Sequence, residues 1–231
     1  MLAGGRGGRL GEWTKTRPKA LVEIGGRPVI WHVMRLCAHH GLREFVIATG
    51  YKGEQIERYF HDRDSGTPWS VAVEDTGPGT LTGGRLRRLR AHLDGETFLL
   101  AWCDGLTDLD LGELLEFHRS HGRLVTLSAV HPRSPFGHLE LEDGRVTRFT
   151  EKPRRADEWV SGGFFAVEPG VLDYLEGDDS DWDSEVLVRL AGEGELMAYR
   201  HGGFWRCVDT PEEAASLDSE WRAGAPWAVW D

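Results

Sequence analysis

The segment PVIWHVMRLCAHHGLREFVIATG (28–50) joins a helical pattern to a short apolar run that is typical of a buried strand. Pro28 at an early helical position and Gly41 at a C-terminal position favour a helix between them, because each residue suits that end of a helix. The run FVIATG (45–50) is apolar almost throughout, as a strand covered on both faces must be. We therefore predict one helix-and-strand unit of an α/β protein.

The same alternation of strand-like and helix-like segments continues along the chain. An acidic cap near Asp110 and a glycine at Gly122 bound a further predicted helix. Short alternating pieces around Asp143 and Gly144 predict antiparallel hairpin strands. We expect an α/β fold with a Rossmann-like, mostly parallel sheet flanked by helices, and with added antiparallel strands in the second half. The other predicted strands are WSVAVE (69–74), TFLLAW (97–102) and RLVTLSAV (123–130).

Length and composition favour one globular domain over residues 1–231, because the chain has 231 residues, 40% of them hydrophobic, and no linker or internal repeat. The net charge of −11 has the wrong sign for a protein that binds nucleic acid through its phosphates, so we expect no nucleic-acid partner. No run approaches the roughly 18 apolar residues of a membrane span, and we expect a cytoplasmic protein without a membrane partner. Three widely spaced cysteines argue against a disulfide or zinc scaffold: Cys37, Cys103 and Cys207.

A glycine-rich segment near the start, LAGGRGGRL (2–10), is followed by the basic segment KTRPKALVEIGGRP (15–28). Glycines let backbone N–H groups approach a polyphosphate, and basic side chains supply the opposite charge, so the pair predicts an anion cradle. The alternative is a flexible glycine-rich terminus. The segment matches neither a P-loop nor a dinucleotide fingerprint, because no GK[ST] follows it and no strand-like run precedes it.

Two aspartates each follow a strand-like run, which makes them candidate metal ligands. Asp104 follows TFLLAWC, and Asp209 follows GFWRCV. Ligands in open α/β sheets bind beyond the carboxyl ends of strands, and Mg²⁺ takes one or two carboxylates together with phosphate oxygens. The alternatives are a turn residue for Asp104 and a helix N-cap for Asp209.

Seven segments in series resemble the sugar-1-phosphate nucleotidyltransferases, and most resemble the branch that uses CTP and glucose 1-phosphate. The resemblance covers essentially the whole chain. It implies attack of a sugar-phosphate oxygen on the α-phosphorus of a nucleoside triphosphate, with pyrophosphate as the leaving group. After LAGGRGGRL with its Pro-Lys pair, the segments are GYKGEQIERYF (50–60), EDTGPGTLTGGRL (74–86), CDGLTDLD (103–110), EKP (151–153), WVSGGFF (159–165) and GFWRCVDT (203–210).

The resemblance also implies roles for particular residues. Arg9, Lys19 and Asp104 would be catalytic, and Asp104 and Asp209 would hold Mg²⁺. Residues 1–135 would form mainly the nucleotide-binding half, 136–210 mainly the sugar-binding half, and 211–231 a C-terminal helix and tail. The implied nucleotide-binding residues are Leu2, Ala3, Gly4, Gly5, Arg9, Lys19, Thr80, Thr82, Gly83 and Cys103. The implied sugar-phosphate-binding residues are Arg85, Glu151, Lys152, Trp159, Gly162 and Gly163.

The chain departs from the family pattern at three positions. Met1 stands directly before Leu2, so we expect either a shortened first strand or a misassigned start site. Gly8 replaces the usual threonine, which removes a hydroxyl, and Cys103 replaces a glycine before the metal aspartate. The basic and acidic residues of the implied site remain.

We predict an enzyme that transfers a nucleotidyl group from a nucleoside triphosphate to a sugar 1-phosphate. CTP is the first candidate for the donor, and glucose 1-phosphate is the first candidate for the acceptor. Its partners are then small molecules, and we expect a homo-oligomer. The alternatives are another sugar 1-phosphate or dTTP or UTP as substrate, a metal-dependent glycosyltransferase, and an inactive homologue that binds sugar nucleotides.

Overall fold

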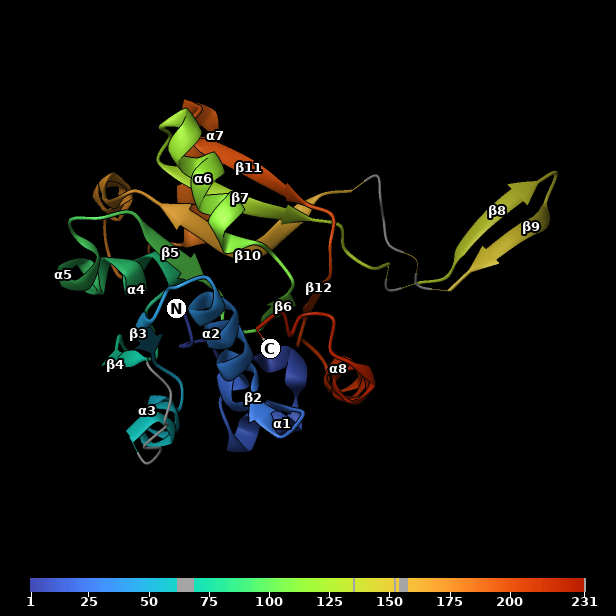
Figure 1. The fold of residues 1–231 in the computed structure, drawn as a ribbon, viewed down its shortest axis with the longest axis horizontal. Coiled ribbons are helices and arrows are strands. Elements are labelled where there is room, and N and C mark those ends of the chain that lie inside the picture. Colours follow the sequence, from blue (N-terminus) through green and yellow to red (C-terminus); the bar gives the residue numbers. More distant parts are fainter. Residues whose placement is uncertain (62–68, 135, 152, 154–157, 231) are drawn as a thin grey trace.

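The computed structural model describes residues 1–61, 69–134, 136–151, 153 and 158–230 (Figure 1). Lys152, one of the predicted sugar-phosphate-binding residues, lies outside these described residues. A central sheet runs through the molecule, with helices on both of its faces, and a two-stranded hairpin projects away from it (Figure 1). No helix in the described ranges is long and apolar enough to span a membrane.

The central sheet has the order β4-β3-β5-β10-β7-β11 and consists of two hydrogen-bonded groups. Leu2 lies between the groups and bridges Ala48 of β3 and Trp102 after β5, in parallel with both. Of the strands that the structure describes in this sheet, β10 alone runs against its neighbours, so the prediction of a mostly parallel sheet is confirmed. The strands are β3 (Glu44–Thr49), β4 (Ser70–Asp75), β5 (Phe98–Ala101), β7 (Val125–Val130), β10 (Val160–Val167) and β11 (Leu196–His201).

Successive residues of the strands pack into different hydrophobic clusters, because side chains alternate between the faces of a sheet. Ile47 and Phe164 pack with helices α2 and α6, whereas Ala48 and Phe165 pack with α4 and α7. Both faces of the sheet are therefore buried, which explains the apolar strand runs in the sequence. These helices are α2 (Val29–His39), α4 (Thr82–Arg88), α6 (Leu111–His121) and α7 (Leu187–Glu193).

The predicted helix ends are confirmed at α6, whereas α2 begins after Pro28, which is its N-cap, and has His40 rather than Gly41 as its C-cap. Asp110 caps α6 by accepting a hydrogen bond from the Glu113 backbone N–H at 3.0 Å, and Gly122 ends it in the left-handed conformation. Among the first ten residues the ladder contacts come from Leu2. Leu2 therefore occupies the place of a central strand between β3 and β5.

The C-terminal helix α8 (Pro211–Ala223) packs a third hydrophobic cluster against the segment that follows the glycine loop. Thr210 starts α8 with a capping box, so the helix predicted after Asp209 is confirmed with Thr210 as its N-cap. Trp227 beyond this helix is 1% exposed and lies in the same cluster as Leu10 and Ile24. The end of the chain thus supports the loop that lines the site.

The hairpin of β8 (His138–Glu142) and β9 (Arg145–Thr150) turns through Asp143 and Gly144, both with positive φ, as predicted. It stands away from the rest of the molecule (Figure 1). The remaining elements are η1 (Gly8–Leu10), α1 (Glu12–Thr16), η2 (Lys19–Leu21), β1 (Glu23–Ile24), β2 (Arg27–Pro28), α3 (Gly53–His61), α5 (Arg90–Leu93), β6 (Gly105–Thr107), η3 (Pro169–Tyr174), η4 (Trp182–Val186) and β12 (Trp205–Cys207).

Candidate active site

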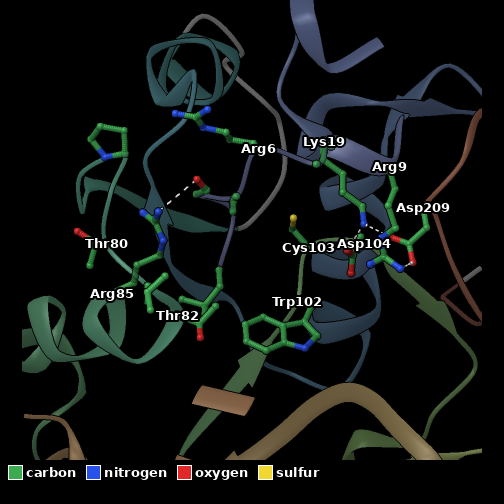
Figure 2. A pocket seen from close by; sticks show the side chains of 18 of the residues that line it. Arg6, Arg9, Lys19, Thr80, Thr82, Arg85, Trp102, Cys103, Asp104 and Asp209 are labelled. Carbon is green, nitrogen blue, oxygen red and sulfur yellow. Dashed lines mark hydrogen bonds and ion pairs between the residues drawn. The ribbon is translucent and has the colours of Figure 1, made fainter. Parts of the chain in front are cut away.

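A cleft of about 730 Å³ opens where β3 and β5 end, and it collects most of the predicted site residues (Figure 2). The glycine loop and the segment 78–82 form its walls, and Trp102, Cys103 and Asp104 lie between them. The predicted site residues that line it are Leu2, Ala3, Gly4, Gly5, Arg9, Lys19, Thr80, Thr82, Arg85, Cys103, Asp104 and Asp209.

The glycine loop is anchored to the sheet at its start. The Leu2 N–H donates to the Ala101 carbonyl at 3.1 Å, and the Ala3 N–H donates to the Ala48 carbonyl at 2.9 Å. Farther along, Gly7 takes a positive φ of 61°, and the Thr14 hydroxyl donates to its carbonyl at 3.3 Å. These bonds give the loop a defined path, so the alternative of a flexible glycine-rich terminus is not what the structure shows.

A buried arginine lies beneath this loop. Arg85 is 4% exposed, and its guanidinium donates to the Thr49 carbonyl at 2.7 Å, the Thr76 hydroxyl at 2.6 Å and the Gly4 carbonyl at 3.2 Å. A Cβ on Gly4 would lie 2.2 Å from the Arg85 guanidinium carbon, so a larger residue there would displace the guanidinium. Figure 2 shows this bond from Arg85 to the loop. The glycine is therefore needed for the arginine to pack, a reason that the sequence pattern does not reveal.

Lys19 joins the two aspartates that the sequence singles out. Its Nζ lies 2.5 Å from Asp104 Oδ2 and 2.5 Å from Asp209 Oδ1, and Arg9 Nη1 lies 2.9 Å from Asp209 Oδ2 (Figure 2). The side chains of Lys19, Asp104 and Asp209 are mostly buried, whereas that of Arg9 is 75% exposed. Two cations and two carboxylates that are far apart in the chain thus meet at one end of the cleft.

The electrostatics of this cluster keep Lys19 charged. Burial disfavours the ammonium, but the charge of Asp104 and the hydrogen bonds with both aspartates outweigh burial and raise the pKa of Lys19 above its ordinary value. Next to it, burial and the Asp104 charge raise the pKa of the Cys103 thiol to about 12. Cys103 is therefore a neutral, buried lining residue and not a thiolate nucleophile.

The wall opposite the glycine loop is held by α4. The Thr82 hydroxyl donates to Asp181 Oδ2 at 3.2 Å and accepts from the Trp182 backbone N–H at 2.8 Å, which fixes the start of the helix against η4. A Cβ on Gly83 would lie 2.8 Å from the Ser180 carbonyl oxygen, so Gly83 serves close packing of α4. Gly83 is not among the residues that line the cleft.

Trp102, the last residue of the predicted strand 97–102, lines the cleft (Figure 2). Its backbone N–H donates to the Gly163 carbonyl at 2.9 Å, and a Cβ on Gly163 would lie 2.6 Å from its ring. Gly163 has a positive φ of 79° at a register shift in β10, so it is the glycine of a bulge in this strand. Trp102 directly follows β5 and directly precedes Cys103 and Asp104. This position is the sequence signal that could have predicted it as a site residue.

The other predicted sugar-phosphate residues lie apart from the cleft lining. Gly162 accepts a hydrogen bond from Trp205 Nε1 at 2.9 Å. The Trp159 ring packs against the His131 ring, with 3.8 Å between centroids, and lies under the Arg200 guanidinium. Glu151 is an exposed residue beyond the end of β9, and Lys152 lies outside the described residues. The predicted sugar-phosphate residues are thus not gathered at one place, and their roles stay predictions.

Solved structures share this α/β nucleotidyltransferase fold. HddC from Yersinia pseudotuberculosis superposes with a TM-score of 0.74 over 95% of this chain and 97% of that chain, at 19% sequence identity. The chain belongs to the nucleotidyl transferase family, whose model matches residues 1–214. The family implied by the sequence motifs is therefore confirmed.

Two curated relatives match the full length of the chain. A glucose-1-phosphate cytidylyltransferase from Salmonella typhi is 40% identical over 255 residues, covering 100% of this chain and 98% of that protein. A probable glucose-1-phosphate cytidylyltransferase from Bacillus subtilis is 38% identical over 251 residues with the same coverage. Such coverage supports a shared arrangement of the whole chain and not of one motif.

Proposed function

We propose that this protein transfers the cytidylyl group of CTP to a sugar 1-phosphate, with glucose 1-phosphate as the first candidate, and releases pyrophosphate. The observation that carries the proposal is the convergence of Arg9, Lys19, Asp104 and Asp209 at one end of a cleft walled by the glycine loop. The full-length relatives from Salmonella typhi and Bacillus subtilis support the choice of CTP and glucose 1-phosphate.

The reaction asks for alignment and charge more than for covalent chemistry. A sugar-phosphate oxygen forms a bond to the α-phosphorus of the triphosphate, and the bond from that phosphorus to the pyrophosphate oxygen breaks. The attacking phosphate is already ionised, so no base is needed. Lys19, mostly buried, and Arg9, exposed at the mouth, supply positive charge for the phosphates. The glycine loop offers backbone N–H groups without side chains in the way.

The two aspartates fit a divalent cation, and we propose Mg²⁺. The fit rests on the two carboxylates, because Asp104 Oδ2 and Asp209 Oδ1 each lie 2.5 Å from the same ammonium and so are close enough to hold one cation together. Among the described residues no cluster of three or more His, Cys, Asp or Glu side chains could hold a metal. Two carboxylates with phosphate oxygens are the set Mg²⁺ uses with nucleotides. When bound, Mg²⁺ would neutralise phosphate charge.

Arg85 has a positioning role in this proposal. Its guanidinium is engaged with the Gly4 carbonyl and with two groups of the strand ends, so it holds the path of the glycine loop from below. Desolvation lowers the pKa of Arg85, and the group stays cationic because an arginine pKa lies far above neutrality. A positive charge under the loop favours an anion above it.

The substrate assignment is tested by offering CTP, dTTP, UTP and GTP with a panel of sugar 1-phosphates and following pyrophosphate release. We expect release with CTP and glucose 1-phosphate above every other pair. Release with another pair would revise the substrates within the same reaction. No release with any pair, together with CTP binding, would favour an inactive homologue, and transfer from CDP-glucose to an acceptor would favour a glycosyltransferase. The division into halves and the cytoplasmic location stay predictions.

A further inference from the structure

The two carboxylates of the candidate cation site stand at one end of a short antiparallel ladder formed by β6 and β12 (Figure 1). Asp104 directly precedes β6, and Asp209 follows the end of β12 by two positions. At this end of the ladder Gly105 lies opposite Cys207. The Val208 N–H then donates to the Asp104 carbonyl at 3.0 Å. The placement of β6 against β12 therefore sets how far apart the two carboxylates lie.

Apolar packing decides which face of this ladder is buried. Leu106 of β6 and Val208 after β12 are fully buried in the third hydrophobic cluster. A slip by one residue would turn these side chains to the other face, so their burial excludes it. Apolar contacts are not directional, however, and two short strands hold their register weakly. Directional bonds are needed to place the two strands to within about an ångström, the precision that catalytic groups require.

Asp108, directly after β6, supplies such bonds at the opposite end of the ladder. Its Oδ1 accepts from the Phe204 N–H at 2.6 Å and lies 2.8 Å from Nε2 of His201. Because a carboxylate accepts and does not donate, this ring nitrogen carries a proton. The Phe204 carbonyl accepts from the Thr107 hydroxyl at 2.7 Å and from the Asp108 N–H at 3.3 Å. Phe204, directly before β12, is thus bonded through both of its backbone groups to the end of β6.

The segment between β11 and β12 closes tightly around the Asp108 carboxylate. A Cβ on Gly203 would lie 2.4 Å from Asp108 Oδ1 and 2.5 Å from His201 Cε1. The side chains of Asp108 and His201 are 31% and 12% exposed, so water replaces these bonds poorly. His201 is the last residue of β11, and its ring therefore ties the ladder to the central sheet.

We propose that Asp108 is a positioning residue for the reaction. Through Phe204 and His201 it fixes β12 against β6. It thereby sets the separation of the Asp104 and Asp209 carboxylates. Asp108 does not line the cleft, so it acts through these neighbours and not on a substrate. The catalytic consequence rests on the function proposed above, whereas the placement of the ladder does not.

Hydrogen exchange of the Val208 amide, followed by NMR, tests the placement of the ladder without any ligand. This amide bonds the Asp104 carbonyl beside the site. In Asp108→Ala we expect it to exchange at least about tenfold faster, because the far end of the ladder is released, while the amides of β3 keep their rates. Asp108→Asn keeps an acceptor oxygen and should keep most of the protection. Asp94→Ala is the matched control, since Asp94 is exposed and lies outside the cleft lining.

The kinetics of pyrophosphate release test the consequence for catalysis. Asp108→Ala should lower kcat by about ten- to a hundredfold and change KM for CTP less than about threefold, because misplaced groups cost rate more than binding. Asp108→Asn should restore most of kcat, a rescue that a merely space-filling role would not require. Asp94→Ala should leave both constants unchanged.

An unchanged exchange rate of the Val208 amide in Asp108→Ala would overturn the proposal, as would faster exchange with an unchanged kcat. If Asp108→Ala does not fold, His201→Ala carries the same test, because it removes one of the two donors and leaves the Phe204 bonds. If the unaltered protein released no pyrophosphate, the proposed function would fail. The exchange of the Val208 amide would then still decide whether Asp108 holds the ladder.

Discussion

Asp104 and Asp209 follow different strands, β5 and β12, and their carboxylates nevertheless meet at the same ammonium group of Lys19. Each is mostly buried, and each would be left close to another negative charge if that cation were removed. The pair is therefore an arrangement that stability alone does not favour, and an anionic substrate with its cation gives a reason for it.

Replacing either carboxylate should stop catalysis with little change in the fold. We expect Asp104→Asn and Asp209→Asn each to lower kcat by on the order of a thousandfold, since lost charge stabilisation in phosphoryl transfer has this scale. Pyrophosphate release measures the effect. Asp110→Asn is the control, because Asp110 caps α6 outside the cleft and asparagine also caps helices well. Full activity in Asp104→Asn or Asp209→Asn would contradict the assignment of the pair.

A methyl group added at Gly4 should destabilise the protein, whereas the same group added at Gly5 should not. Gly4→Ala places a carbon 2.2 Å from the Arg85 guanidinium carbon, and we expect a loss of about 1–3 kcal/mol in the free energy of unfolding. Gly5→Ala meets nothing within 4 Å and should leave the melting temperature unchanged. Thermal denaturation of the two variants checks this, and equal melting temperatures would show that Arg85 does not support the loop.

The buried histidine His32 predicts a loss of stability in acid. Its Nδ1 accepts from Trp227 Nε1 at 3.3 Å and its Nε2 bonds the Ile24 carbonyl at 2.9 Å, an arrangement that suits the neutral ring. Burial lowers its pKa to about 4 from 6.5. Between these values the unfolded chain binds the proton more readily, so stability falls as pH drops through this window and is flat above it.

The full effect of His32, reached below pH 4, is about 3 kcal/mol. Urea denaturation at several pH values between 4 and 7 measures it, with His32→Gln as the comparison. The variant should lose part of the slope over this range. A slope that is the same in both proteins would assign the acid sensitivity to other groups.

Gly163→Ala should displace Trp102 and so alter the lining of the cleft. The new Cβ would lie 2.6 Å from the Trp102 ring, and the positive φ of 79° at this position strains any other residue. We expect weaker CTP or CDP-sugar binding together with a lower melting temperature. Gly177→Ala, which meets nothing within 4 Å, serves as its control in calorimetric titration. Unchanged binding in Gly163→Ala would remove Trp102 from the site.

The sequence predicts elements whose signals are local and misses contacts made at long range. Apolar runs and end residues locate β3, β5 and α6, because burial on both faces and capping are written in neighbouring residues. The two aspartates are found because each follows a strand. The partner of Gly4 is not found, since Arg85 approaches from a distant helix, and the place of Trp102 in the cleft wall depends on Gly163 of another strand. Such relationships exist only after the chain has folded.

Leu2 connects two groups of strands that share no other ladder pairing within the described residues, and it also lines the cleft. A nucleotide bound in the cleft would contact the glycine loop on one side and the residues after β5 on the other. It would therefore hold the two groups of strands together. The two groups of strands should therefore separate less readily when the ligand is bound. Limited proteolysis of the ligand-free and ligand-bound protein would reveal this difference.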